Sequence, residues 1–143
     1  MPSDSNFSFA DIVEGTTIDR DYSVTSSVYE AFLIAFDDRS PVHVDDEYAK
    51  ASGFRERVMH GAILNGFLSN FIGMHFPGRQ ALWLSVDLRY LAPTYLGDEL
   101  NVQAVVSQKV ESQRVLVLNI VIRNRSQGVI AARGRVQVAL RDD

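Results

Sequence analysis

Apolar and polar side chains alternate with two different periods along the chain. Residues 60–75 carry apolar side chains around most of the circumference of a helix, and Pro77-Gly78 closes that segment. After Gly78 the apolar side chains fall on even-numbered positions, which is the period of a half-buried strand. Four stretches have this pattern: Leu82, Leu84, Val86, Leu88 and Tyr90; Leu100, Val102, Ala104 and Val106; Leu116, Leu118, Ile120 and Ile122; and Ile130, Ala132, Val136, Val138 and Leu140.

Turn-forming residues separate these stretches at positions 93–98, 111–113 and 126–128. Four consecutive strands with short turns predict an antiparallel meander, whose single apolar face needs a cover. The 60–75 helix is the only adequate cover, and a helix that is apolar around most of its girth should be buried. With residues 16–24 as a fifth strand, we predict an α+β fold in which a curved antiparallel sheet wraps around one long, buried central helix.

Local signals place two further helices before the central one. Ser27 and Glu30 match a Ser-x-x-Glu capping box, so a helix is predicted to begin there and to end before Pro41. Residues 38–45 are then expected to form a loop. A second, short helix should follow this loop and end at Ser52.

The composition fits one globular domain over residues 1–143, with 46% hydrophobic and 22% charged residues. The net charge of -4 disfavours general attraction to nucleic acid or to anionic membranes. The chain has no cysteine, its N-terminus shows no secretion signal, and residues 60–76 are too few and too polar to span a bilayer. We therefore expect a cytoplasmic protein that binds neither nucleic acid nor membrane.

The predicted loop places a carboxylate, Asp38, five residues before an imidazole, His43, with Pro41 stiffening the chain between them. Such a pair can share one water, which the carboxylate orients while the histidine moves its proton, and this is general acid–base catalysis. The spacing alone fits another interpretation better, in which Asp38 caps a turn and His43 packs under the next helix.

His60-Gly61 opens the predicted central helix. Unpaired N–H groups and the positive end of the helix dipole at that point form a site for a developing oxyanion, and Gly61 lets a ligand approach the backbone. A thioester carbonyl bound there would be polarised, which makes C3 of a conjugated enoyl group electrophilic toward water. Close packing of helix and sheet would explain the glycine equally well.

Together these segments resemble the MaoC-like hydratases and dehydratases, whose signature runs Asp-x-Asn-Pro-x-His-x-Asp and, after a gap, His-Gly. The matching residues are DRSPVHVD at 38–45, Phe54, Val58, His60 and Gly61, YLAPTYLGD at 90–98 and FADIVEG at 9–15. Three ordered motifs are far more specific than one, so the resemblance favours catalysis. One position departs from the pattern, because Ser40 stands where the family has Asn.

The resemblance implies a hot-dog fold, a homodimer with a continuous sheet, and an acyl group carried on coenzyme A or on a carrier protein. The implied reaction is reversible hydration of a trans-2-enoyl thioester to the (R)-3-hydroxyacyl thioester. No cofactor is implied beyond the coenzyme A of the substrate.

The resemblance also implies roles for individual residues. Asp38 and His43 would be the water-activating pair, and the backbone of Gly61 would bind the carbonyl. Ser40, His60 and Ser69 are assigned to substrate binding, although Ser69 is equally well explained as a small residue on a helix face.

Two other functions remain open. A hot-dog thioesterase would use the same carbonyl-polarising helix end, but its usual acidic residue lies on the central helix, and residues 61–76 contain no Asp or Glu. A non-catalytic acyl-binding subunit would keep the fold and lose the pair, whereas Asp38, His43 and Gly61 are all present.

Three further expectations concern partners. A metal site is not expected, because the histidines show no ligand spacing with acidic residues. The arginines of the outward strand face could meet the phosphates of coenzyme A, but a solvated face explains them better; they are Arg123, Arg125, Arg133 and Arg135. A homodimer is expected from the open sheet edge and from Trp83 and Leu91, which the strand period places outward.

Overall fold

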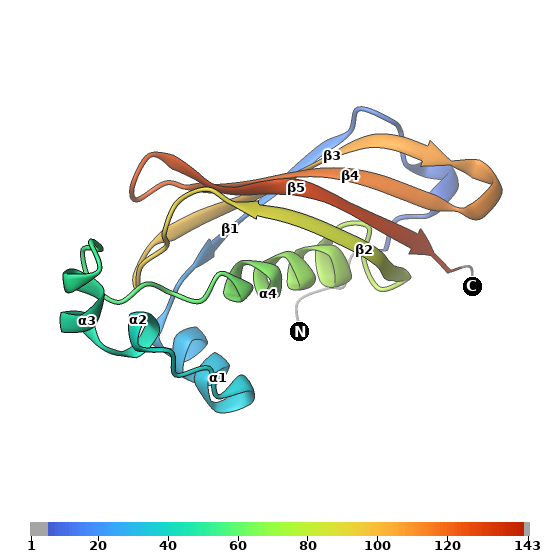
Figure 1. The fold of residues 1–143 in the computed structure, drawn as a ribbon. Coiled ribbons are helices and arrows are strands. Elements are labelled where there is room, and N and C mark those ends of the chain that lie inside the picture. The colour runs from blue at the N-terminus through green and yellow to red at the C-terminus, as the bar shows by residue number, and fades with distance from the viewer. Residues whose placement is uncertain (1–5, 142–143) are drawn as a thin grey trace.

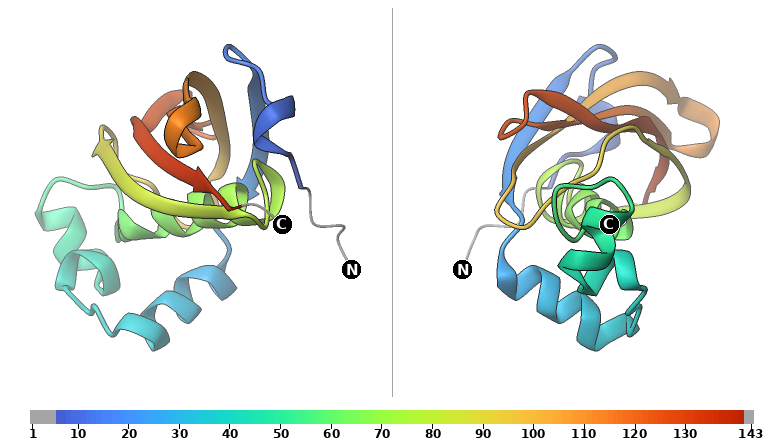
Figure 2. Two further views of the ribbon diagram at one scale, coloured as in Figure 1. Left: turned by 90° about the vertical axis from the view of Figure 1, so that its right-hand side faces the viewer. Right: turned by 60° about the vertical axis from the view of Figure 1, so that its left-hand side comes forward.

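A five-stranded antiparallel sheet curls around one helix in the computed structural model, which describes residues 6–141 (Figures 1 and 2). The strands are β1 (Thr17–Ser23), β2 (Ala81–Tyr90), β3 (Glu99–Val110), β4 (Val115–Asn124) and β5 (Val129–Leu140). The helices are α1 (Ser26–Phe36), α2 (Pro41–Val44), α3 (Asp46–Ala51) and α4 (Ala62–Asn70), with short turns η1 (Phe9–Asp11), η2 (Phe71–His75) and η3 (Glu111–Gln113). The predicted α+β class and the wrapped central helix are confirmed.

The order of the strands differs from the predicted meander. The sheet runs β1-β3-β4-β5-β2, so only β3, β4 and β5 follow one another, while β2 pairs with β5 at the far edge. Residues 91–98 join β2 to β3 across the end of the sheet. Eight residues reach about 26 Å when extended, and three strand spacings are about 14 Å, so this connection is long enough to cross. The strand period identifies strands but does not say which ones are neighbours.

A bulge in β2 reverses the predicted alternation of buried and exposed side chains in the first half of this strand. The register shifts between Trp83 and Ser85, and Trp83 lies opposite the buried Val138, so it faces the core. The prediction that Trp83 points outward is therefore wrong. Leu82 and Leu84, predicted to be buried, are 52% and 53% exposed. The even-numbered positions of β3 and β4 are buried as predicted.

The helix α4 is buried on one side only. Its sheet-facing side chains are part of the main core, together with those of the η2 turn that extends it: Ile63, Leu64, Phe67, Leu68, Phe71 and Ile72. The opposite side, which carries Ala62, Gly66, Ser69 and Asn70, is exposed in the single chain. The expected full burial is therefore wrong for the isolated chain. Among residues 6–141, no helix combines the length and apolar composition that crossing a bilayer requires.

Two local predictions before α4 are corrected. The cap of α1 is Thr25, whose hydroxyl accepts from the N–H of Val28, so the helix begins one residue before the predicted Ser27 box. The predicted loop at 38–45 contains α2, which begins at Pro41 because proline is pre-organised for the first position of a helix. The three helices α1 to α3 lie below and beside the open end of the sheet, near the start of α4 (Figure 1).

Candidate functional site

Asp38 lies in the short link between α1 and α2. The link begins at Asp37, which ends α1 in the left-handed conformation with φ of 53°. Ser40 donates to Oδ1 of Asp38 from its N–H, at 3.1 Å, and from its hydroxyl, at 2.6 Å. This turn orients the carboxylate and leaves Oδ2 without a donor among residues 6–141.

The same donors keep the Asp38 carboxylate charged. The Ser40 hydroxyl, followed by the Ser40 N–H, holds the pKa of Asp38 below its ordinary value. Desolvation acts against these two hydrogen bonds and is smaller than either of them, and the nearby His43 and His60 add a still smaller lowering. At neutral pH Asp38 is therefore a carboxylate that can only accept hydrogen bonds.

His43 lies on α2 and is held in one tautomer. Its Nδ1 lies 2.7 Å from the carbonyl oxygen of Val58. Because a carbonyl only accepts, Nδ1 carries the proton, and Nε2 of the neutral ring keeps a free lone pair. The backbone beside the ring is fixed as well, since the Tyr29 hydroxyl donates to the His43 carbonyl at 2.6 Å. A fixed ring with a free Nε2 is suited to accept a proton.

His60 is buried between two other rings. It is 3% exposed, and its ring centroid lies 4.1 Å from that of His43 and 4.5 Å from that of Phe32. Its Nε2 lies 2.7 Å from the carbonyl oxygen of Asp38 and must donate to it. Its Nδ1 is buried without a hydrogen-bond partner among the described residues. His60 thus ties the start of α4 to the link that carries Asp38.

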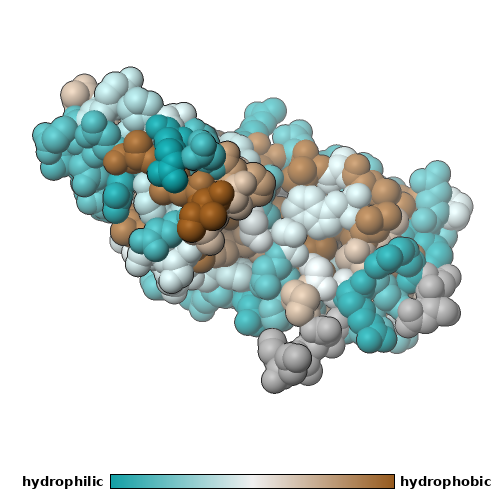
Figure 3. All heavy atoms as spheres, turned by 90° about the horizontal axis from the view of Figure 1, so that it is seen from below, coloured by the Kyte–Doolittle hydropathy of each residue, from teal (hydrophilic) through white to brown (hydrophobic). Residues whose placement is uncertain are grey.

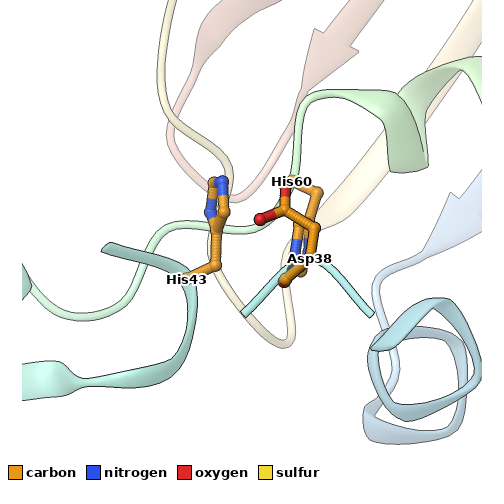
Figure 4. A group of neighbouring side chains, drawn as sticks. All are labelled: Asp38, His43 and His60. Atoms are coloured by element: carbon orange, nitrogen blue, oxygen red, sulfur yellow. Dashed lines mark hydrogen bonds between the residues drawn. The ribbon is translucent and has the colours of Figure 1, made fainter. Parts of the chain in front are cut away.

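These three side chains converge although 22 residues separate the first from the last. Asp38, His43 and His60 each offer an atom that lies within 4.8 Å of the others. Figure 4 shows the Asp38 carboxylate directed toward the His43 ring, with His60 beside it. The three could bind a metal ion or form hydrogen bonds with one water. Their spacing along the sequence, which does not match a metal-ligand pattern, therefore did not reveal how close they lie in space.

Gly61 precedes α4 and faces a cavity. Its N–H donates no hydrogen bond within residues 6–141. The ring of Tyr90 lies over its Cα, since a Cβ there would be 3.3 Å from two ring carbons. Gly61 and His43 line a cavity of about 330 Å³ whose other walls include Tyr90 and residues 91–94. The close approach explains the glycine structurally, and its role as a carbonyl donor stays a prediction.

Two sets of candidate residues lie elsewhere. Ser69 is exposed on α4, eight residues beyond Gly61, which is about 12 Å along the helix axis. Arg133 and Arg135 line a hollow of about 780 Å³ on the outer face of the sheet, which shares no residue with the cavity at His43. The assignment of Ser69 to substrate binding stays a prediction.

Sequence reasoning did not find three residues that hold the cluster together. Tyr29 and Phe32 are three residues apart on α1, so they share a helix face that points at the histidines. The sequence shows that the two residues share a helix face, but it does not show that this face is directed at the histidines. The Val58 carbonyl acts through its backbone, which no side-chain pattern reveals.

Comparison with known proteins places this geometry in context. A family model described as MaoC like domain matches residues 9–124. An (R)-specific enoyl-CoA hydratase of Rhodospirillum rubrum is 27% identical over 93% of this chain and 92% of its own length. A 3-hydroxybutyryl-CoA dehydratase of Methylorubrum extorquens is 29% identical over 74% of this chain and 68% of its own. The solved structure of the R-hydratase PhaJ1 from Pseudomonas aeruginosa aligns with a TM-score of 0.87 at 26% identity, covering 96% of this chain and 88% of that one.

The hydrogen bond from Ser40 can be tested by titration. Ser40→Ala removes the hydroxyl and keeps the N–H, so the pKa of Asp38 should rise partway toward its ordinary value. Because the folded-state pKa lies below the unfolded one, the contribution of Asp38 to stability is present above the ordinary pKa and is lost as the pH falls below it. Carboxyl ¹³C NMR in acid measures the shift. Ser52→Ala, which removes a hydroxyl that donates to the Tyr48 carbonyl, is the control. An unchanged Asp38 pKa in Ser40→Ala would contradict the assignment.

Proposed function

The chain belongs to the family of MaoC-like domains, and we propose that it is a hydro-lyase that adds water reversibly to the double bond of an acyl thioester. The substrate class is a trans-2-enoyl thioester on coenzyme A or on a carrier protein, and the product is the (R)-3-hydroxyacyl thioester. Relatives named as an (R)-specific enoyl-CoA hydratase and a 3-hydroxybutyryl-CoA dehydratase support this reaction. A cytoplasmic location, expected from the composition, is part of the same proposal.

The observation that carries the proposal is the convergence of two acceptors beside a free donor. A carboxylate oxygen of Asp38 and a ring nitrogen of His43 lie within 4.8 Å of each other. Asp38 Oδ2 and His43 Nε2 have no hydrogen-bond partner among residues 6–141, so we propose that a single water donates one hydrogen to each. The N–H of Gly61 lies on the same cavity as His43 and is free to bind a carbonyl oxygen. These are the parts that conjugate addition of water requires.

The proposed steps use these groups in turn. His43 Nε2 takes a proton from the water as the water oxygen bonds to C3 of the enoyl group. The electrons of the double bond move toward the thioester carbonyl, whose oxygen becomes an enolate that the Gly61 N–H stabilises. The proton held by His43 then passes to C2, so one water is added and both groups return to their starting state. Dehydration follows the same steps in reverse.

The structure bears on the two other functions. A hot-dog thioesterase would need an acidic residue on the central helix, and residues 61–76 contain none. A non-catalytic subunit would have no need to keep His43 in one tautomer with Nε2 free. Hydration is therefore the function that the geometry supports best.

Replacing either member of the pair should abolish most of the activity. Each proton-handling group contributes about 10²- to 10⁴-fold, so Asp38→Asn and His43→Ala should each lower the hydration rate by at least the lower figure. The double variant should be little worse than either single one, because both act on the same water. The loss of enoyl absorbance of crotonyl-CoA measures the rate, and release of free thiol measures hydrolysis.

Asp37→Asn is the matched control, because Asp37 is the neighbouring carboxylate and, within residues 6–141, forms its ion pair with the exposed Arg39. It should keep near wild-type turnover. Thermal melting should show all variants folded. Near wild-type turnover in folded Asp38→Asn or His43→Ala, on every enoyl thioester that the parent hydrates, would refute the assignment.

We also propose that turnover needs no metal, since the pair can activate water by proton transfer alone. Dialysis against a strong chelator should leave the hydration rate unchanged, with metal content measured before and after. Because Asp38, His43 and His60 could bind an ion, the assay is a real test of the proposal. Loss of activity that returns only when a metal is added back would overturn it.

A homodimer formed through the β2 edge is part of the proposal. β2 is an edge strand with one side unpaired, and it carries three exposed apolar side chains, Leu82, Leu84 and Val86. Light scattering at micromolar concentration should give a dimer mass. Leu84→Lys should shift the equilibrium toward monomer, whereas the control Ile34→Lys, at a more exposed apolar residue on α1, should not. A stable wild-type monomer would disprove the dimer.

A further inference from the structure

The hollow of about 780 Å³ on the outer face of the sheet lies over β2, β4 and β5. The helices lie on the opposite side of the sheet (Figure 1), where apolar side chains gather over the end of the molecule that carries α1 (Figure 3). The charged residues that line the hollow are three arginines and one acid: Arg89, Arg133, Arg135 and Asp87. The hollow therefore carries a net positive charge, although the net charge of the chain is -4.

The strand register brings the three guanidinium groups together. Arg89 on β2 lies directly opposite Arg133 on β5, and Arg135 lies two residues further along β5 on the same face. Cβ atoms of directly opposite residues are about 5 Å apart, and alternate residues of one strand are roughly 7 Å apart. A Cβ at Gly134 would overlap the carbonyl oxygen of Asp87, so only glycine allows β2 to approach β5 this closely. Like charges directly opposite each other destabilise a sheet, so the stability of the fold does not explain the arginine pair.

No group within residues 6–141 neutralises these arginines. The side chains of Arg89, Arg133 and Arg135 are exposed and form no hydrogen bond or ion pair with that part of the chain. Asp87 lies opposite Arg135 in the register but does not form an ion pair with it. On its other side, Arg133 lies opposite Val121 of β4, which has no charge. A bound anion would relieve the repulsion between the three cations.

We propose that this hollow binds the diphosphate group of a small ligand other than the substrate. A guanidinium presents a planar fork of donors that matches two phosphate oxygens, and three forks anchored within about 7 Å of their neighbours suit two linked phosphates. The hollow has the size of a small-molecule site. Among its outward-facing residues only Val121 is apolar, so it lacks the apolar centre of a protein interface. None of its lining residues is aromatic, so the phosphates and not a stacked base are recognised.

The phosphates of the substrate are a separate case, because the hollow and the cavity at His43 lie on opposite faces of β2. Tyr90 lines the cavity, and its neighbour Arg89 lines the hollow, so the strand itself separates the two spaces. A dimer joined through the β2 edge, as proposed above, would close the direct route around that edge. This step rests on the proposed dimer and does not depend on the proposed hydration.

The test is calorimetric titration of the full chain with inorganic pyrophosphate, with inorganic phosphate as the comparison. We expect one pyrophosphate per chain, bound at least tenfold more tightly than phosphate. Arg133→Gln and Arg135→Gln should each weaken pyrophosphate binding about tenfold or more, because each removes hydrogen bonds between charged groups. Asp87→Asn should strengthen binding, because the carboxylate repels the anion.

Arg123→Gln is the matched control, because it makes the same change of charge on the same face of the sheet. Arg123 is exposed, donates to Gln103 and does not line the hollow. This variant should keep the affinity for pyrophosphate within twofold of the wild type. Arg133→Lys keeps the charge and loses the fork, so it should weaken binding as well, whereas general attraction to an anion would be unchanged.

Three results would overturn the proposal. One is the absence of pyrophosphate binding, or binding that folded Arg133→Gln and Arg135→Gln leave unchanged or that Arg123→Gln weakens equally. The second is a KM of Arg133→Gln that rises for crotonyl-CoA and not for crotonyl-pantetheine, which would assign the arginines to the coenzyme A of the substrate. The third is dissociation of the Arg133→Gln dimer in light scattering, which would assign them to an interface between chains. If the wild type fails to hydrate crotonyl-CoA, the proposed reaction is refuted, while the pyrophosphate titration still decides the hollow.

Discussion

The hydrogen bond from His60 Nε2 to the carbonyl of Asp38 is the contact on which the site depends. It joins the link that follows α1 to the start of α4. A bond to a backbone carbonyl is independent of the charge on the Asp38 side chain, so the carboxylate stays free to face His43. Burial of the His60 ring between Phe32 and His43 excludes water that would compete for the bond.

The central helix could be predicted from the sequence because its signal is local and strong. The same is true of the strands β3 and β4, whose predicted even-numbered positions from Leu100 to Val106 and from Leu116 to Ile122 are buried. The place of β2 in the sheet could not be predicted, because the crossing of residues 91–98 depends on the curvature of the whole sheet. The bulge after Trp83 had no signal either, since a run of Leu-Trp-Leu is apolar on both faces.

The candidate site also has parts that the sequence predicts and parts that it does not. The side chains of Asp38 and His43 and the glycine at 61 could be identified, because motifs are made of side chains. The hydrogen bonds that position the His43 and His60 rings are made to backbone carbonyls, those of Val58 and Asp38. The direction of a backbone carbonyl cannot be predicted from a pattern of side chains. The sequence argument against a metal site has a related limit, because it used spacing along the chain, whereas the fold brings Asp38, His43 and His60 together in space.

Ser40 shows how a departure from the family pattern can preserve the geometry. An Asn side chain presents an amide that both donates and accepts, whereas the serine hydroxyl is shorter. Here the hydroxyl and the N–H of the same residue converge on one oxygen of Asp38. Two donors from one residue therefore hold this oxygen in the turn before Pro41. The substitution therefore changes which atoms hold Asp38 and leaves Oδ2 without a donor among residues 6–141.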